Sequence, residues 1–301
     1  MTSDAAKTTV AAVQMRSVPC DVAGNLAKAE VFLERASRDA AKLTLLPELF
    51  NVGYFIGPEL FELWEPDDGP TVTWMREQAA RHDMLVAGTI AERCGDRLLN
   101  TMLIAEPDGG LHRYSKRQPW KLELPAFDHG DDEAIVATSL GRTGCAICAD
   151  LNWGRTVLHP LAGKVDLLLF PQASSAPKAL GRLMWRQERK RGRPMLAPAV
   201  KAIGAPMVLA GLIGSLQRYT RVFGAYMYGG TWITDAEGRA LANVPFDEEG
   251  VAIAAVSLIS TGGDPSAKVF RDPGFGRDIM NSLVVNLPNL RPLRRRPDPQ
   301  P

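Results

Sequence analysis

The 301-residue sequence is poor in several features, and each scarcity excludes a class of protein. It carries 35 Lys and Arg residues against 34 Asp and Glu, so the formal net charge of +1 argues against nucleic-acid binding through an overall field. No apolar run approaches the ~18 residues of a membrane span, and residues 1–7 lack the apolar stretch of a secretion signal. We therefore expect a soluble cytoplasmic protein whose partners are small molecules, with no nucleic acid and no membrane among them.

Cysteine and histidine are also scarce. Four cysteines are too few and too scattered for a secreted disulfide framework in a chain of this length. Cys145 and Cys148 form a Cys-x-x-Cys pair, but no second pair accompanies it at zinc-finger spacing, and the four histidines are dispersed. We expect neither a metal site nor a cofactor.

Apolar runs rich in Val, Ile and Leu alternate with longer amphipathic stretches, which is typical of a layered α/β protein. Residues 8–15 predict a buried strand, 25–41 an amphipathic helix and 43–46 the next strand. Further strands are expected at residues 84–90, 100–105, 135–138, 145–148, 167–170 and 208–213. Turn residues at 106–110 and 235–238 each separate two short apolar strands and predict hairpins, so we expect mixed rather than purely parallel sheets.

The chain is expected to form one main domain. No internal repeat of ~20 to 50 residues is visible, and no Gly/Ser linker divides the sequence. We assign residues 1–275 to this domain and residues 276–301 to an extended, basic, Pro-rich C-terminal tail. The segment 182–193 is crowded with Arg and Lys, and the sequence leaves open whether it covers a pocket or lies at a subunit contact.

Cys148 is a candidate nucleophile, although a free cysteine taken alone is more often a core residue. If residues 144–150 form a strand, alternation places Cys148 with Ala146 and Asp150 on one face, and Cys145 with Ile147 on the other. The two sulfurs would then diverge, which argues against a redox pair. Cys148 would stand at the end of the strand and face a pocket.

Acyl chemistry at a thiol needs a nearby base, an acid for the leaving group, and a cation or donor pair for the oxyanion. Glu48 offers a carboxylate at the end of a buried strand, and strand ends are where sites form in open α/β sheets. Lys116 and Glu123 lie in a stretch interrupted by Pro119 and Pro125, which predicts an ordered loop rather than a solvated helix.

Three motifs in this order resemble the catalytic blocks of the nitrilase, or carbon–nitrogen hydrolase, superfamily, and the resemblance spans most of the chain. The first block is Pro47-Glu48 followed by Gly53-Tyr54, the second is Tyr114 and Lys116 with Glu123, Phe127 and Gly130, and the third is Gly144, Ile147, Cys148 and Asp150. Three blocks at the expected spacing are far more specific than any one alone. The resemblance implies a four-layer αββα sandwich with mixed sheets, over residues 1–275, that assembles into a homodimer or larger homo-oligomer.

The resemblance also implies a Glu-Lys-Cys triad at Glu48, Lys116 and Cys148. Cys148 would attack a carbon bonded to nitrogen, with Glu48 as the base that first takes the thiol proton. Lys116 and the backbone N–H of Ala149 would hold the oxyanion, and Glu123 would orient Lys116. A thioester would form and then be hydrolysed.

Further residues are assigned around this triad. Asp150 is expected to be structural and to accept backbone hydrogen bonds at the turn after Cys148. The pocket walls are expected to include aromatic and amide side chains, namely Tyr54, Trp120, Trp153 and Gln172.

The sequence departs from the family pattern where substrates are selected. Gln118 stands where many members carry His two residues after the lysine. Members that cleave N-carbamoyl amino acids clamp a carboxylate with arginines just after the cysteine, and Leu151 and Asn152 cannot do that. The acid two residues after the cysteine is Asp150 rather than the Glu of many nitrile hydrolysers, which favours an amide substrate.

The favoured function is therefore hydrolysis of a small amide, and other functions stay open. The same acyl-enzyme could pass to an amine, which would make the protein an acyltransferase or amide synthase. Nitrile or carbamoyl substrates are further alternatives. A non-catalytic binding protein that retains the fold is the last.

Overall fold

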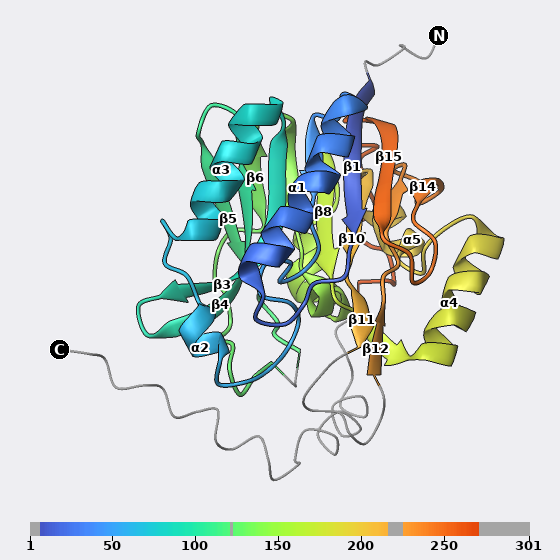
Figure 1. Cartoon of the computed structure of the whole chain (residues 1–301). Coiled ribbons are helices and arrows are strands. Elements are labelled where there is room, and N and C mark those ends of the chain that lie inside the picture. The colour runs from blue at the N-terminus through green and yellow to red at the C-terminus, as the bar shows by residue number, and fades with distance from the viewer. Residues whose placement is uncertain (1–6, 121–122, 216–224, 271–301) are drawn as a thin grey trace.

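The computed structural model describes residues 7–120, 123–215 and 225–270 (Figure 1). Its helices are α1 (Val22–Arg38), α2 (Leu60–Leu63), α3 (Pro70–His82), α4 (Lys178–Arg191) and α5 (Ala197–Ile203), with short helical turns at Cys148–Asn152, Gly154–Leu158 and His159–Leu161. Within these described ranges no helix is long and apolar enough to cross a membrane.

Fifteen strands in the described ranges form three sheets. They are β1 (Lys7–Gln14), β2 (Leu43–Leu45), β3 (Leu85–Cys94), β4 (Arg97–Ala105), β5 (Leu111–Ser115), β6 (Ile135–Thr138), β7 (Gly141–Cys145), β8 (Leu167–Gln172), β9 (Ser175–Pro177), β10 (Met207–Gly211), β11 (Ile213–Ser215), β12 (Ala225–Tyr228), β13 (Trp232–Thr234), β14 (Ala240–Asn243) and β15 (Gly250–Ser257). One six-stranded sheet has the order β15-β1-β2-β3-β4-β5 and the other β14-β13-β10-β8-β7-β6, while β11, β12 and β9 form a small third sheet.

Both large sheets are mixed, as the turn chemistry predicts. β1, β2 and β3 run parallel, as do β7, β8 and β10, and the outer strands are antiparallel. The predicted turns at 106–110 and 235–238 join antiparallel neighbours, β4 to β5 and β13 to β14. Parallel central strands with both faces covered explain why their sequences are nearly continuous apolar runs.

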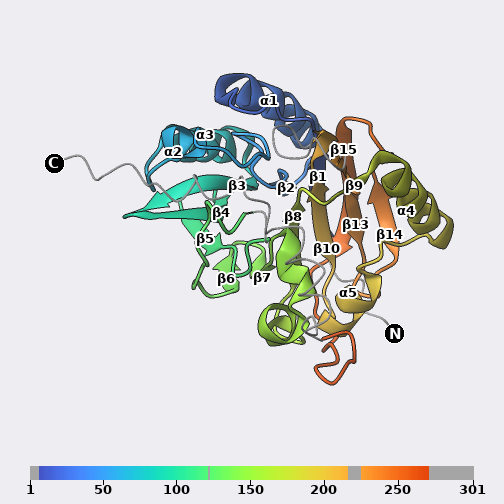
Figure 2. The ribbon, with the colours of Figure 1, turned by 90° about the horizontal axis from the view of Figure 1, so that it is seen from below.

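The two large sheets face each other across a shared apolar core. On β1, Val10 and Ala12 belong to this core together with residues of β8 and β10, whereas Ala11 and Val13 pack on the opposite side among residues of α1 and α3. Figure 2 shows α1 and α3 covering one outer face of the pair of sheets, with α5 on the far side. The predicted four-layer αββα sandwich is confirmed.

The predicted strand at 145–148 is wrong beyond its first residue, because it shares only Cys145 with β7. β7 ends at Cys145, and Cys148 begins a helical turn instead. The side chain of Asp150 accepts the backbone N–H of Ile147 at 2.9 Å, while the backbone N–H of Asp150 donates to the Ile147 carbonyl at 2.9 Å. These two bonds close a turn, so the predicted alternation fails after Ile147.

The first and last strands of the described region are neighbours in one sheet, because β1 pairs with β15 along its whole length. The predicted domain boundary at 275 and the tail at 276–301 fall outside the described residues and stay predictions. The expected cytoplasmic location and homo-oligomer likewise stay predictions.

Gly130 lies against the end of β5 and provides a test of how tightly this region is packed. Its backbone N–H donates to the Lys116 carbonyl at 2.9 Å, and an added Cβ would lie 2.2 Å from the Ser115 carbonyl oxygen. We expect Gly130→Ala to lower the free energy of unfolding by about 1–3 kcal/mol, because backbone must shift to admit the methyl group.

Chemical denaturation of both variants and the wild type measures this. Gly110→Ala is the matched control, since Gly110 is exposed and its added Cβ meets only side chains; it should change stability by less than about 0.5 kcal/mol. Equal stability of Gly130→Ala and the wild type would contradict the close packing.

Candidate active site

The polar residues predicted from the three blocks converge at one end of the sandwich. Glu48 follows β2 and Lys116 follows β5, both in the first sheet, whereas Cys148 follows β7 in the second. Glu123 lies in the loop beyond Lys116. The side chains of Lys116, Glu48 and Glu123 are entirely buried, so none of them is a surface charge.

Lys116 lies between two carboxylates. Its Nζ is 2.6 Å from Glu48 Oε1, and it contacts both Glu123 oxygens, at 3.0 Å and 2.8 Å. Charge-assisted hydrogen bonds of this length are the strong ones, and they hold the ammonium in one orientation. This is the positioning that was predicted for Glu123.

Each carboxylate has further donors that fix it. Asn100 Nδ2 donates to Glu48 Oε1 at 2.9 Å, and the backbone N–H of Ala173 donates to Glu48 Oε2 at 2.8 Å. Tyr54 OH donates to Glu123 Oε1 at 3.0 Å, and the backbone N–H of Trp120 also donates to Glu123. The burial of three ionised groups is therefore compensated by pairing and by hydrogen bonds from four chain segments.

Asn100 was not among the predicted site residues. Its side chain holds Glu48, and its carbonyl accepts the backbone N–H of Lys116 at 2.8 Å, so it contacts two members of the triad. The signal in the sequence was an amide among the apolar residues of β4, which is uncommon in a strand buried on both faces.

The electrostatics of the site keep Lys116 protonated. Burial by itself lowers the pKa of Lys116, but the charges of Glu123 and Glu48 raise it and prevail. Burial raises the pKa of Glu123, and the ammonium of Lys116 opposes that rise. Lys116 is thus a fixed cation, suited to stabilising negative charge and not to accepting a proton.

Cys148 occupies a strained position beside this group. Its φ is +43°, in the left-handed region that a residue with a Cβ seldom adopts, and Leu49, next to Glu48, has φ of +49°. The Cys148 Sγ is 4.0 Å from Ser174 Oγ. Burial raises the pKa of Cys148, the charge of Glu48 raises it further, and Lys116 opposes both. The resting group is a thiol that needs a base to react.

Asp150 joins the turn at Cys148 to the loop at Lys116, in the structural role expected of it. It is fully buried and accepts three hydrogen bonds, from Ile147 N–H, Gln118 N–H and Tyr114 OH, each at 2.9 Å. One carboxylate therefore ties a turn of the second sheet to β5 and its following loop in the first.

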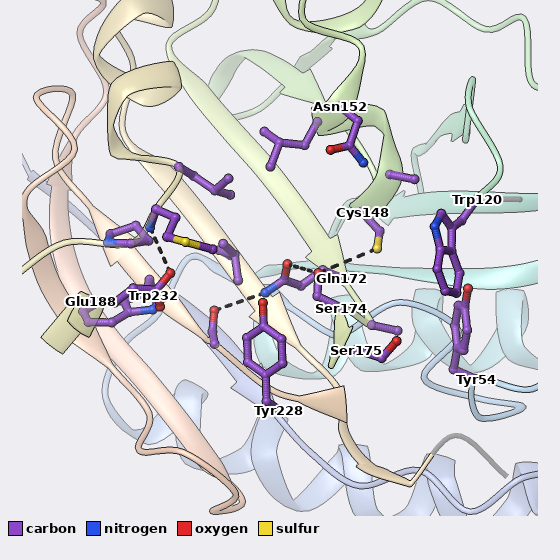
Figure 3. Close-up of a pocket in the computed structure, with 18 residues that line it drawn as sticks. Tyr54, Trp120, Cys148, Asn152, Gln172, Ser174, Ser175, Glu188, Tyr228 and Trp232 are labelled. Atoms are coloured by element: carbon purple, nitrogen blue, oxygen red, sulfur yellow. Dashed lines mark hydrogen bonds between the residues drawn. The ribbon is translucent and has the colours of Figure 1, made fainter. Parts of the chain in front are cut away.

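A pocket of about 300 Å³ opens above Cys148 (Figure 3). Its walls include Tyr54, Trp120 and Gln172, which were predicted as pocket walls, and Ala149, which was predicted to bind substrate through its backbone N–H. The remaining lining residues are mostly apolar or uncharged, namely Leu151, Asn152, Ala173, Ser174, Ser175, Glu188, Pro194, Met195, Leu196, Leu209, Tyr228, Gly230 and Trp232. Ser174 and Tyr228 were not predicted. Ser174 follows β8 and Tyr228 is the last residue of β12, and neither belongs to the three blocks.

Trp153 is the one predicted pocket residue that the structure places elsewhere. It is not in the pocket wall and packs instead against the apolar cluster on the outer side of the second sheet, which includes Val157 and Phe170. The reason is the helical turn that begins at Cys148, because it turns the chain away from the pocket after Asn152.

The basic segment 182–193 lies largely on α4 and in the turn that follows it. Its basic side chains are exposed, but Glu188 is buried and lines the pocket, as do Pro194 and Met195 just beyond. The segment therefore contributes to the pocket wall through Glu188, and a subunit contact of its exposed basic side chains stays a prediction. In the described ranges no group of three or more His, Cys, Asp or Glu side chains is arranged to hold a metal ion.

Comparison with known families agrees with this geometry. The carbon–nitrogen hydrolase family model matches residues 9–264, and the chain belongs to this family.

Curated relatives are similar over part of their length. A chloroplastic omega-amidase of Arabidopsis thaliana is 30% identical over 174 residues, covering 52% of this chain and 47% of the relative. A 2-oxoglutaramate amidase of Bacillus subtilis is 35% identical over 133 residues, covering 43% of this chain and 51% of the relative. The matches thus span about half the length of these relatives.

Solved structures share the fold over most of the chain. A carbon–nitrogen hydrolase from Helicobacter pylori G27 superposes with a TM-score of 0.73 at 19% identity, covering 84% of this chain and 89% of the other. The superfamily protein XC1258 of Xanthomonas campestris has a TM-score of 0.69 at 23% identity, covering 84% and 91%.

Asp150 gives a prediction about stability. We expect Asp150→Ala to lower the free energy of unfolding by about 3 kcal/mol or more, because it leaves three buried donors unpaired. Tyr114→Phe removes only one of the three hydrogen bonds and should cost about 1 kcal/mol. Urea denaturation of both variants measures the difference, and similar losses for the two would show that Asp150 does not act as the link.

The raised pKa of Cys148 gives a prediction about reactivity with pH. The thiolate is the reactive form, so alkylation by iodoacetamide should be slow at pH 7 and should still be rising between pH 9 and pH 10. Peptide mass spectrometry of the Cys148 peptide gives the rate, with Cys148→Ala to assign the signal. A plateau reached below pH 8 would mean that the thiol pKa is low and would contradict this assignment.

Proposed function

We propose that the protein hydrolyses a non-peptide carbon–nitrogen bond of a small amide through a thioester on Cys148. The observation that carries the proposal is the buried ammonium of Lys116 held by Glu48 and Glu123 beside a strained cysteine at the floor of a pocket. A base, a fixed cation and a nucleophile are the three groups that acyl transfer to a thiol requires.

In the first step Glu48 takes the proton of the Cys148 thiol, and the sulfur attacks the amide carbon. The carbonyl oxygen becomes an oxyanion, which the ammonium of Lys116 and the backbone N–H of Ala149 stabilise. Ala149 lies in the first turn of the helix that begins at Cys148, where an N–H has no partner within the helix. One preorganised donor of this kind is typically worth ~2.7 to 4 kcal/mol.

In the second step the carbon–nitrogen bond breaks, and Glu48 returns the proton to the departing nitrogen. Ammonia or an amine leaves, and the acyl group remains on Cys148 as a thioester. A water molecule then gives a proton to Glu48 and adds to the thioester carbon, and collapse releases the carboxylic acid and restores the thiol. Glu48 acts as base and acid in turn, and Lys116 stays charged throughout.

The relatives named as amidases support an amide as the substrate. Asp150 in place of Glu and the absence of clamping arginines at Leu151 and Asn152 favour the same choice over nitriles and N-carbamoyl amino acids. We place substrate contacts at Tyr54, Trp120, Ala149 and Gln172, which line the pocket.

Substitution of the triad tests the proposal. With a panel of small amides, nitriles and ureido compounds, Cys148→Ala should lower ammonia release by at least about a thousandfold, because it removes the thiol on which the acyl intermediate forms. Glu48→Gln should lower it by about 10²- to 10⁴-fold, the usual contribution of a general base. Circular dichroism checks that both variants are folded.

Cys94→Ala is the matched control, because Cys94 is an exposed cysteine outside the pocket, and its activity should equal that of the wild type. Hydroxylamine should convert the thioester to a hydroxamate in the wild type alone. Turnover by Cys148→Ala at the wild-type rate would refute the mechanism. If added amines yielded amide products in preference to acid, the enzyme would be an acyltransferase.

A further inference from the structure

Glu188 is a buried carboxylate that the proposed mechanism does not use. It belongs to α4, is 7% exposed and lines the same pocket as Cys148. Figure 3 shows Glu188 and Trp232 at one side of the pocket, with Cys148, Trp120 and Tyr54 at the other. The pocket therefore has a reactive end and an opposite end that holds a carboxylate.

The contacts of Glu188 within the protein do not require its charge. Its Oε1 accepts the backbone N–H of Met195 at 2.9 Å, a bond that the carboxamide of a glutamine would make equally well. Among the described residues no ion pair at contact distance involves Glu188. Burial raises its pKa, whereas the Met195 N–H, the Trp232 indole and the more distant charge of Arg191 lower it. A buried carboxylate is costly unless it is paired, which points to a partner that is not part of the chain.

The surroundings of Glu188 suit a cation. Trp232 and Tyr228 present aromatic rings to the same part of the pocket, and aromatic faces attract ammonium and guanidinium groups. Burial raises the pKa of Tyr228 to about 12, so its hydroxyl stays neutral. Leu196 and Leu209 are apolar parts of the wall that would contact methylene groups. Among the described residues that line the pocket, none is cationic.

We infer that the end of the pocket at Glu188 is a binding site for a protonated amine, so that preferred substrates are amides with an ammonium group remote from the scissile bond. This inference rests on the proposed function. The ammonium would donate a charge-assisted hydrogen bond to Glu188 while the amide carbon lies at Cys148. An amide that carries a carboxylate at its far end would meet like charge there and would be a poor substrate.

A substrate series tests the site. Amides of the form H₃N⁺–(CH₂)ₙ–CONH₂, over a range of chain lengths, are each compared with the neutral alkanamide of equal length by kcat/KM. In the wild type the best aminoamide should exceed its neutral counterpart by about 10- to 100-fold, the usual contribution of a hydrogen bond between charged groups. The chain length at the maximum reports the span from Cys148 to Glu188.

Glu188→Gln separates the charge from the structural bond to Met195. The ratio of cationic to neutral kcat/KM should fall close to one in this variant. Glu106→Gln is the matched control, because Glu106 is also buried and accepts the backbone N–H of Ser139 at 2.9 Å, but it does not line this pocket; its ratio should equal that of the wild type. A purely structural role for Glu188 would lower both rates equally and leave the ratio unchanged.

The outcomes distinguish the inference from the proposed function. Equal rates for cationic and neutral amides in the wild type, or a preference that survives Glu188→Gln, would overturn the amine site and leave amide hydrolysis standing. If the wild type cleaves no amide, the proposed function fails, and calorimetry with Cys148→Ala then decides the site alone. Tighter binding of the aminoamide than of the neutral amide, lost on adding Glu188→Gln, would support it, and equal binding would refute it.

Discussion

The buried ammonium of Lys116 between Glu48 and Glu123 is the interaction on which the rest of the site depends. An uncompensated charge at full burial would cost several kcal/mol, so the surrounding chain must supply both carboxylates and the donors that hold them. These donors come from Asn100 in β4 and from Tyr54, Trp120 and Ala173, which lie in three separate loops. The pairing of charges in the site and the packing of the two sheets therefore depend on each other, because a shift of either sheet would leave a buried charge unpaired.

The sandwich supplies these groups from loops at one end, where its two sheets lie side by side. The loops after β2 and β5 bring acid and base groups from one sheet, and the turn after β7 brings the thiol from the other. Asp150 bridges the two with three hydrogen bonds, so a buried carboxylate with no role in the proposed mechanism positions Cys148, the proposed nucleophile, relative to Lys116. Positive φ at Cys148 and Leu49 places backbone strain beside the proposed reacting groups, and such strain often clusters at functional sites.

Much of the fold was predictable from periodicity and turn chemistry. The strands at 8–15 and 135–138 and both hairpins agree with the structure within a residue or two, because an apolar run with a definite turn has few alternatives. The strand predicted at 145–148 shares only Cys145 with β7, since apolar residues favour an extended chain and the hydrogen bonds of Asp150 override that preference beyond Cys145. Trp153 was misplaced for the same reason, because an error at that turn changes the direction of every side chain beyond it.

By itself the sequence determined mixed α/β layers, through apolar period and turn residues, and three blocks that supply Glu48, Lys116 and Cys148, through residue types at fixed local spacing. The four-layer sandwich followed from the resemblance of these blocks to the family. Tertiary structure alone decided which distant groups meet them. Asn100 and Glu188 belong to no motif, and only their surroundings in the folded protein give them significance. Asn100 contacts Glu48 and Lys116, whereas Glu188 has no ion-pair partner among the described residues and lines the same pocket as Cys148. Spacing along a chain encodes local geometry, whereas contacts between sheets and helices depend on how whole layers pack.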